Sequence, residues 1–175
     1  DKCPICNSKA EIEEDEAAIR CLNYDCPAQI QRRIEHWCSR DAMDLDGVGE
    51  SLIEQLLKND LVKDPIDLYF LKQEDLVNLE RMAEKSANNA ITSIQNSKER
   101  TLDRLMFALG IRHVGKTIAE LLSRRFASLE ELSNVSLEQL TEVDGIGPKI
   151  AKSVVDFFKL ESTHKMIKKI SKAGI

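Results

Sequence analysis

Apolar residues recur along most of the chain at the three- and four-residue spacing of amphipathic helices. The clearest runs are Leu102, Leu105, Met106 and Leu109, and then Ile150, Val154, Phe157 and Phe158. This spacing places the apolar side chains on one face of each helix. Beyond roughly the first two dozen residues, no stretch alternates between apolar and polar positions as a core strand does. The pattern therefore predicts a mainly α fold.

The helical part contains an internal repeat. Four segments align: GVGESLIEQL at 47–56, RMAEKSANNA at 81–90, HVGKTIAELL at 113–122 and GIGPKIAKSV at 145–154. They begin 34, 32 and 32 residues apart, a period typical of a repeated supersecondary unit. We expect each unit to be two helices joined by a short turn. The four turns should lie near 46–49, 80–83, 112–115 and 144–147.

The fourth repeat carries Gly145 and Gly147, followed by Pro148 and Lys149 at a helix start. Glycine tolerates positive φ and lets another molecule approach the main chain, and proline suits the first helical turn. The free amides of that turn favour an anion, so phosphate binding is one interpretation. The other is that the glycines only form a tight turn between helices.

Four cysteines near the N-terminus have metal-ligand spacing. Cys3 and Cys6 form C-x2-C, Cys21 and Cys26 form C-x4-C, and 14 residues separate the pairs. Four thiolates satisfy tetrahedral zinc and leave no position for water, which predicts a structural site. Disulfides are the alternative, but the cysteines cluster in pairs, a fifth is left over, and no segment reads as a signal peptide. The intervening AEIEEDEAAIR at 10–20 predicts a two-stranded ribbon with an acidic tip.

The fifth cysteine, Cys38, lies on the apolar side of a helix that we expect to begin at Pro27. A buried free thiol explains it better than a redox or ligand role. The three histidines, His36, His113 and His164, have no spacing to acidic residues or cysteines that suggests catalysis.

The formal net charge of −5 is unusual for a protein that binds nucleic acid, but the charge is unevenly distributed. Residues 1–97 carry 11 Lys and Arg against 20 Asp and Glu, whereas residues 98–175 carry 14 against 10. Basic residues gather around the third and fourth repeats, either as solvated helix faces or as a track for phosphates. These residues are Lys98, Arg100, Arg104, Arg112, Lys116, Arg124 and Arg125, then Lys149, Lys152, Lys159, Lys165, Lys168, Lys169 and Lys172. Aromatic residues make up 5% of the chain, which argues against a stacking platform for single strands.

The four units resemble helix-hairpin-helix motifs, in which an apolar residue separates two glycines and a small residue follows four positions later. The apolar residue is Val48, Met82, Val114 or Ile146, and the later position is Ile53, Ala87, Ala119 or Ala151. The third copy has His113 for its first glycine, and the second has Arg81 and Ala83 for both. The resemblance implies non-specific binding of duplex DNA through main-chain amides. The residues it implies are Gly47, Gly49, Arg112, Gly115, Lys116, Gly145, Gly147 and Lys149.

The order of these parts resembles the bacterial NAD-dependent DNA ligases over essentially the whole chain. The residues that carry the resemblance are CPIC at 3–6, Cys21 with Cys26, SRDAMDLDGVGE at 39–50, LERMAEKSANNAI at 79–91, ALGIRHVGKTIAELL at 108–122 and VDGIGPKIA at 143–151. It implies a zinc module with its following helix at 1–38 and a helix-hairpin-helix DNA-binding domain at 39–175. It also implies a cytoplasmic protein that works on nicked duplex DNA, without a membrane and in contact with other domains of its parent.

In this family a lysine in a K-x-D-G motif is adenylated by NAD before the nick is sealed. The two Asp-Gly pairs here, in DLDG at 44–47 and EVDG at 142–145, are not preceded by that lysine. We therefore expect the chain to be an inactive fragment that positions DNA, with NAD and magnesium bound elsewhere in the parent.

Two other classes of function remain open. One is a DNA-binding scaffold of a repair nuclease or recombination protein, since these also use tandem hairpins. The other is a helical module that binds proteins, which predicts an apolar surface and no salt-dependent affinity for DNA.

Overall fold

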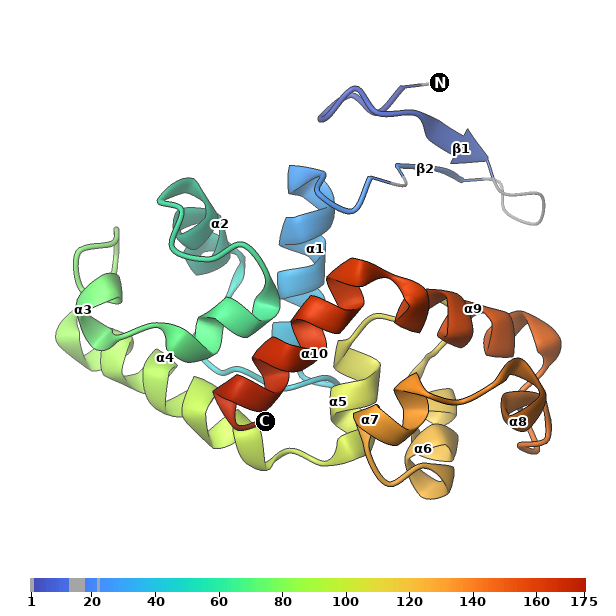
Figure 1. The fold of residues 1–175 in the computed structure, drawn as a ribbon. Coiled ribbons are helices and arrows are strands. Elements are labelled where there is room, and N and C mark those ends of the chain that lie inside the picture. The colour runs from blue at the N-terminus through green and yellow to red at the C-terminus, as the bar shows by residue number, and fades with distance from the viewer. Residues whose placement is uncertain (1, 13–17, 22) are drawn as a thin grey trace.

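The computed structural model describes residues 2–12, 18–21 and 23–175, and shows a short ribbon followed by a mainly helical body (Figure 1). Strands β1 (Ala10–Ile12) and β2 (Ile19–Cys21) pair antiparallel, with Ala10 opposite Cys21. The ribbon is confirmed, while its expected acidic tip at 13–17 lies outside the described residues. The mainly α fold is confirmed as well.

Helix α1 (Pro27–Cys38) begins at the predicted proline, which occupies its first turn. Ile34 and Trp37 on this helix are fully buried in the same apolar core as the helices that follow. Trp37 Nε1 donates a hydrogen bond to the Tyr69 hydroxyl at 3.1 Å, and that hydroxyl lies 2.7 Å from Ser97 Oγ. Because these polar groups satisfy one another, the core tolerates them.

The helical hairpins follow one another along the chain, as the repeat predicts (Figure 1). Hairpin 1 pairs α1 with α2 (Glu50–Lys58), and hairpin 2 pairs α3 (Gln73–Leu76) with α4 (Glu84–Asn96). Hairpin 3 pairs α5 (Leu102–Ala108) with α6 (Lys116–Arg125), and hairpin 4 pairs α8 (Leu137–Thr141) with α9 (Pro148–Lys159). The connecting elements are the 3-10 helices η1 (Pro65–Phe70) and η2 (Ser97–Glu99) and helix α7 (Leu129–Ser133). Helix α10 (Glu161–Ala173) follows hairpin 4.

The repeated small position is buried in every hairpin. Ile53, Ala87, Ala119 and Ala151 each have an exposed fraction of 1% or less. Three of the apolar turn residues, Val48, Val114 and Ile146, are also buried, and Met82 packs against the core while partly exposed. In hairpins 2, 3 and 4 this residue is alanine, so the two helices can pack closely there.

The C-terminal helix α10 packs against η1 and α9. Lys169 on α10 pairs with Asp64 and Asp67 at the start of η1, and its Nζ lies 2.6 Å from Asp67 Oδ1. These side chains are about one-quarter to one-third exposed, so water screens the pair less than it screens a surface pair. Among the described residues, no helix is long and apolar enough to cross a membrane.

Candidate zinc centre and nucleic-acid interface

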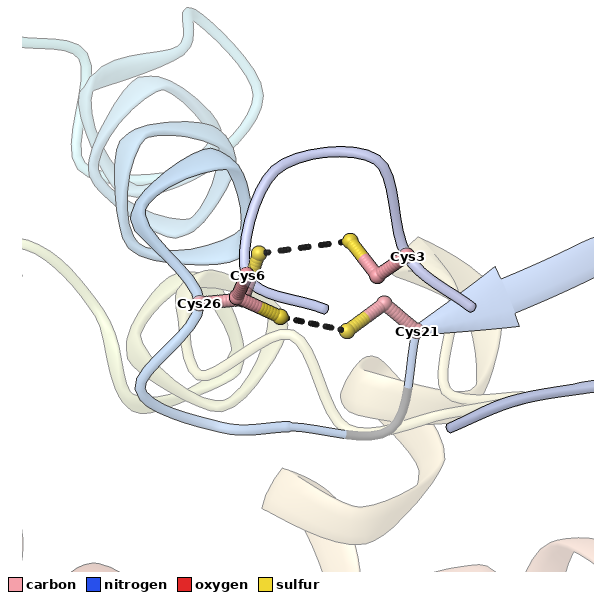
Figure 2. Close-up of side chains that lie close together, drawn as sticks. All are labelled: Cys3, Cys6, Cys21 and Cys26. Atoms are coloured by element: carbon pink, nitrogen blue, oxygen red, sulfur yellow. Dashed lines mark hydrogen bonds between the residues drawn. The ribbon is translucent and has the colours of Figure 1, made fainter. Parts of the chain in front are cut away.

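The four predicted cysteine ligands converge on one point (Figure 2). Their sulfur atoms all lie within 4.8 Å of one another, with 3.9 Å between Cys3 and Cys26 and 3.5 Å between Cys6 and Cys21. A tetrahedron with zinc–sulfur bonds of about 2.3 Å places its sulfur atoms roughly 3.8 Å apart. All four are free thiols in the structure. The cluster therefore has the donor chemistry and the dimensions of a structural zinc site.

Two short loops position these cysteines. In the first, the Asn7 amide donates to the Cys3 carbonyl at 2.9 Å, and Asn7 adopts a positive φ of 58°. In the second, the Cys26 amide donates to the Asn23 carbonyl at 3.1 Å. Asn23 Nδ2 also donates to Ser8 Oγ at 3.1 Å, which links the two loops. The backbone hydrogen bonds of the two loops and the hydrogen bond between the Asn23 and Ser8 side chains thus bring the four sulfur atoms together.

Two of the thiols have shifted pKa values. Hydrogen bonds from the Ser8 side chain and amide are the main reason that the pKa of Cys6 falls to about 6. The Asn23 amide lowers the pKa of Cys21, but burial and the neighbouring thiols outweigh it and raise this pKa to about 12. Because all four ligands must be thiolates, metal binding releases the protons that the cluster holds.

The four hairpin turns share one backbone conformation. Each turn closes with an amide-to-carbonyl hydrogen bond spanning three residues, from Val48 to Leu45, Met82 to Leu79, Val114 to Ile111 and Ile146 to Val143, at 3.0–3.3 Å. The third residue of each turn has positive φ, as a type II turn requires at that position. These residues are Gly47 at 79°, Arg81 at 61°, His113 at 63° and Gly145 at 88°. The departures from glycine at Arg81 and His113 therefore leave the turn intact.

The two glycines of a G-x-G pair have different structural roles. Gly145 has positive φ, and a Cβ at this position would meet Leu121 Cδ1 at 2.9 Å. Gly147 has φ of −80°, which any residue adopts, and a Cβ there would meet nothing within 4 Å. Gly49 and Gly115 have the same open space. The fold would accept a side chain at these three positions. Glycine there leaves an exposed backbone that an outside molecule can approach closely.

Each second glycine also begins a helix. Gly49, Gly115 and Gly147 are the N-cap residues of α2, α6 and α9, and none of them makes a side-chain capping bond. The first amides of such helices have no partner inside the helix, and the helix dipole is positive there. In hairpin 2 the N-cap is Ala83, whose amide donates to Ser86 Oγ at 2.9 Å. The helix starts of hairpins 1, 3 and 4 thus offer more to an anion than that of hairpin 2.

Several basic residues near hairpin 3 contact the loop at 39–46. Arg100 Nη2 lies 3.1 Å from Asp44 Oδ2, and Arg104 Nε donates to the Ala42 carbonyl at 2.7 Å. Lys116, at the start of α6, lies 3.0 Å from Asp41 Oδ1. The sequence interpretation missed these contacts because their partners are 56 to 75 positions apart along the chain.

The other predicted DNA-binding residues are accessible to different degrees. Lys149 is exposed in the first turn of α9, next to Gly147. Arg112 is partly buried and is the second residue in the turn of hairpin 3, directly before His113. The structure thus places the predicted glycines and cations at hairpin turns and helix starts. Their contact with DNA stays a prediction.

Comparison with known proteins finds a family match for two stretches of the chain. Residues 2–28 match the family described as the NAD-dependent DNA ligase C4 zinc finger domain, and residues 104–167 match the helix-hairpin-helix motif. The chain is 46% identical over 175 residues to the DNA ligase of Natranaerobius thermophilus and 50% identical over 174 residues to that of Halothermothrix orenii. The DNA ligase of Clostridioides difficile is 46% identical over 175 residues.

These alignments cover 99–100% of the chain but 26% of each relative. The chain therefore spans about a quarter of the length of the curated DNA ligases that it matches. Over its whole length it is thus similar to one segment of the DNA ligases, and it carries the C4 zinc finger of the NAD-dependent kind.

Proposed function

We propose that this chain binds duplex DNA without reading its base sequence and forms part of an NAD-dependent DNA ligase. The observation that carries the proposal is the shared backbone of the hairpin turns, three of which lead into a helix through a glycine with open space around it. A phosphate can approach such a helix start closely enough to accept hydrogen bonds from main-chain amides. Contacts of this kind position a protein on DNA but carry no sequence information.

The predicted division into a zinc module at 1–38 and a DNA-binding domain at 39–175 belongs to this proposal. Cys3, Cys6, Cys21 and Cys26 would hold the zinc, which supplies the folding free energy that so small a ribbon lacks. In the second part, the hairpins would hold the duplex in a fixed orientation. The contribution to catalysis is positional, since it reduces the entropic cost of aligning the two ends of a nick.

In the whole protein, we propose, this segment keeps a nicked duplex in place while the 5′-phosphate and 3′-hydroxyl are joined. The lysine that NAD adenylates, and the sites for NAD and magnesium, would be supplied by other parts of the parent chain, because neither Asp-Gly pair here follows such a lysine. Contacts with those parts, a preference for nicked over intact duplex and a cytoplasmic location belong to the same proposal. The match to a ligase zinc finger favours it over a nuclease or recombination scaffold.

Fluorescence anisotropy with labelled duplexes tests the proposal. The zinc-loaded chain should bind intact and nicked duplexes of different sequence with similar salt dependence, and bind the nicked form more tightly. Between about 50 and 200 mM salt, log K should fall linearly with log salt concentration. Absence of salt-dependent binding to any duplex would overturn the proposal and would favour a protein-binding module.

A further inference from the structure

The four hairpins pack as two pairs, each joined at a glycine of a turn. A Cβ at Gly47, in the turn of hairpin 1, would lie 3.8 Å from Ala90 Cα in α4 of hairpin 2. A Cβ at Gly145, in the turn of hairpin 4, would lie 2.9 Å from Leu121 Cδ1 in α6 of hairpin 3. The turn of hairpin 1 is thus fixed to hairpin 2 by packing, and its position relative to hairpins 3 and 4 must come from other contacts.

Arg104 of α5 connects hairpin 3 to the segment that leads into the turn of hairpin 1. Its Nε donates to the Ala42 carbonyl at 2.7 Å, and its Nη2 donates to the Arg40 carbonyl. A guanidinium holds its N–H donors in one rigid plane. Two bonds from the same plane therefore fix the direction of the segment as well as its distance from α5.

Arg100, two residues before α5, makes a second connection to this segment. Its Nε donates to the Met43 carbonyl at 3.3 Å, and its Nη2 lies 3.1 Å from Asp44 Oδ2. The next residue, Leu45, is the first residue of the turn of hairpin 1. We call Arg100, Arg104 and their partners at 40–44 the arginine bridge.

The carbonyl groups of the arginine bridge need these donors. Ala42 and Met43 are fully buried, so water does not reach their backbone. A buried carbonyl that loses its hydrogen bond costs free energy, because nothing replaces the lost donor. Turning Arg100 or Arg104 towards a DNA phosphate would therefore break a bond that the fold needs.

The arginine bridge matters for DNA because the proposed function uses hairpins 1, 3 and 4 together. A duplex has a persistence length of about 50 nm and is rigid over the span of this domain. Its phosphates reach all three helix starts only when the turn of hairpin 1 has the correct position relative to hairpins 3 and 4. A turn that takes this position for part of the time binds with a correspondingly lower apparent affinity.

We propose that Arg100 and Arg104 are positioning residues for DNA binding rather than phosphate ligands. They hold the turn of hairpin 1 where a duplex bound to hairpins 3 and 4 meets it. The inference rests on the proposed function, because it concerns the same hairpins. It gives a role inside the protein to two basic residues that their place in the sequence groups with a phosphate track.

Arg104→Gln tests the arginine bridge in the zinc-loaded chain. If the released turn is correctly placed about one third of the time, the Kd for a duplex should rise about threefold. The salt slope should stay unchanged because no phosphate contact is lost, whereas Lys116→Gln should lower the slope by about one. Arg104→Lys keeps the charge but not the planar donors, so it should recover little of the lost affinity.

Double variants show whether Arg104 acts through hairpin 1. Gly49→Val removes the close backbone approach of hairpin 1, and a Cβ there would meet nothing within 4 Å. Adding Arg104→Gln to Gly49→Val should weaken binding no further, because no contact of hairpin 1 is left to position. Added to Gly147→Val in hairpin 4, Arg104→Gln should still raise the Kd about threefold. Hydrogen exchange should become faster at 45–48 in Arg104→Gln and stay unchanged at 143–146.

The results distinguish the arginine bridge from the proposed function. If Arg104→Gln lowers the salt slope by about one and its loss adds to that of Gly49→Val, Arg104 is a phosphate ligand and the inference is wrong. The inference is also wrong if either Arg104→Gln or Gly49→Val binds as the wild type. In these cases weaker binding by Gly147→Val leaves the proposed function standing. If the wild-type chain binds no duplex even at low salt, both are wrong. Arg100→Gln, at a more exposed position, replaces Arg104→Gln if the latter is unfolded by circular dichroism.

Discussion

Leu121 of α6 packs directly against Gly145 in the turn of hairpin 4, so that a Cβ at Gly145 would lie 2.9 Å from Leu121 Cδ1. The contact joins hairpins 3 and 4 at the turn itself. It also distinguishes Gly145 from Gly147, two residues later, where a Cβ would meet nothing within 4 Å. The first glycine serves the packing of the fold, and the second leaves the backbone accessible.

Gly145→Ala should therefore destabilise the protein. The φ of 88° disfavours a side chain by about 1–2 kcal/mol, and the new methyl group also displaces Leu121. Urea denaturation should show a lower free energy of unfolding for Gly145→Ala than for Gly147→Ala, which should remain within roughly 0.5 kcal/mol of the wild type. Equal stability of the two variants would contradict this division of roles.

Hairpins 4 and 3 should contribute most to DNA binding, hairpin 1 less, and hairpin 2 least. Gly147 and Gly115 begin their helices beside Lys149 and Lys116, whereas Gly49 is followed by Glu50. Ala83 of hairpin 2 already carries a methyl group, and its amide bonds to Ser86. Gly147→Val should thus weaken duplex binding much more than Ala83→Val, by about tenfold or more if a phosphate contact is lost.

Both variants must stay folded by circular dichroism for this comparison, which is measured as the Kd for the same duplex. A folded Ala83→Val protein that binds DNA less well than Gly147→Val would show that glycine hairpins do not capture phosphates in this chain.

Much of this arrangement could be predicted from local sequence. Pro27 marks the start of α1, the ribbon lies between the cysteine pairs, and the period of 32 to 34 residues locates the four turns. These features depend on residues close together in the chain. The positive φ of Arg81 and His113 could not be predicted from residue preference, because residues other than glycine adopt it uncommonly.

The same limit applies to charge. Sequence spacing groups Arg100 and Arg104 with the expected phosphate track, but in the structure they contact the loop at 39–46. Arg32 lies in the part of the chain with an acidic excess and gave no local signal that the fold would place it around the same hollow as Arg112 and Lys149. In each case the partner or neighbour is supplied by a distant segment, and only the folded chain brings them together.

The cysteine cluster predicts one zinc per chain. Chelation should disrupt the ribbon and the cysteine loops, because the small module depends on the metal for stability. The helical signal should persist, since Ile34 and Trp37 anchor α1 in the helical core. Atomic absorption and hydrogen exchange measure the two effects. A zinc-to-protein ratio near zero in freshly purified, reduced protein would exclude the site.

Cys38 should be chemically inert in the folded protein and dispensable for zinc. Burial, with a smaller effect of Glu35, raises the pKa of its thiol to about 12, so the reactive thiolate is scarce at pH 8. In zinc-loaded protein, iodoacetamide should modify Cys38 only after unfolding. Ionisation of Cys38 opposes folding above its unfolded pKa near 9, so stability should fall less with rising pH in Cys38→Ala than in the wild type.

Cys38→Ser provides the corresponding test of metal binding and should retain one zinc. Loss of the metal in this variant, while it remains folded, would mean that Cys38 supports the site in a way that its position in the core does not explain.

Asp41 should restrain Lys116 from binding DNA. Lys116 Nζ lies 3.0 Å from Asp41 Oδ1 at the start of α6, and both side chains are more than half exposed. Their hydrogen bond is the main reason that the pKa of Asp41 lies below its usual value, so the carboxylate stays charged at neutral pH. An exposed pair contributes little to stability. It nevertheless places a negative charge beside a cation that we assign to a phosphate.

Asp41→Asn should therefore leave the fold unchanged and tighten duplex binding by roughly threefold, because one repulsive charge is removed from the interface. Lys116→Gln should weaken binding about equally across sequences and lower the salt slope by about one. Asp44→Asn is the matched control: it makes the same substitution in the same loop, but its partner is Arg100. If Asp41→Asn and Asp44→Asn change the Kd equally, general loop charge rather than the pair with Lys116 sets the affinity.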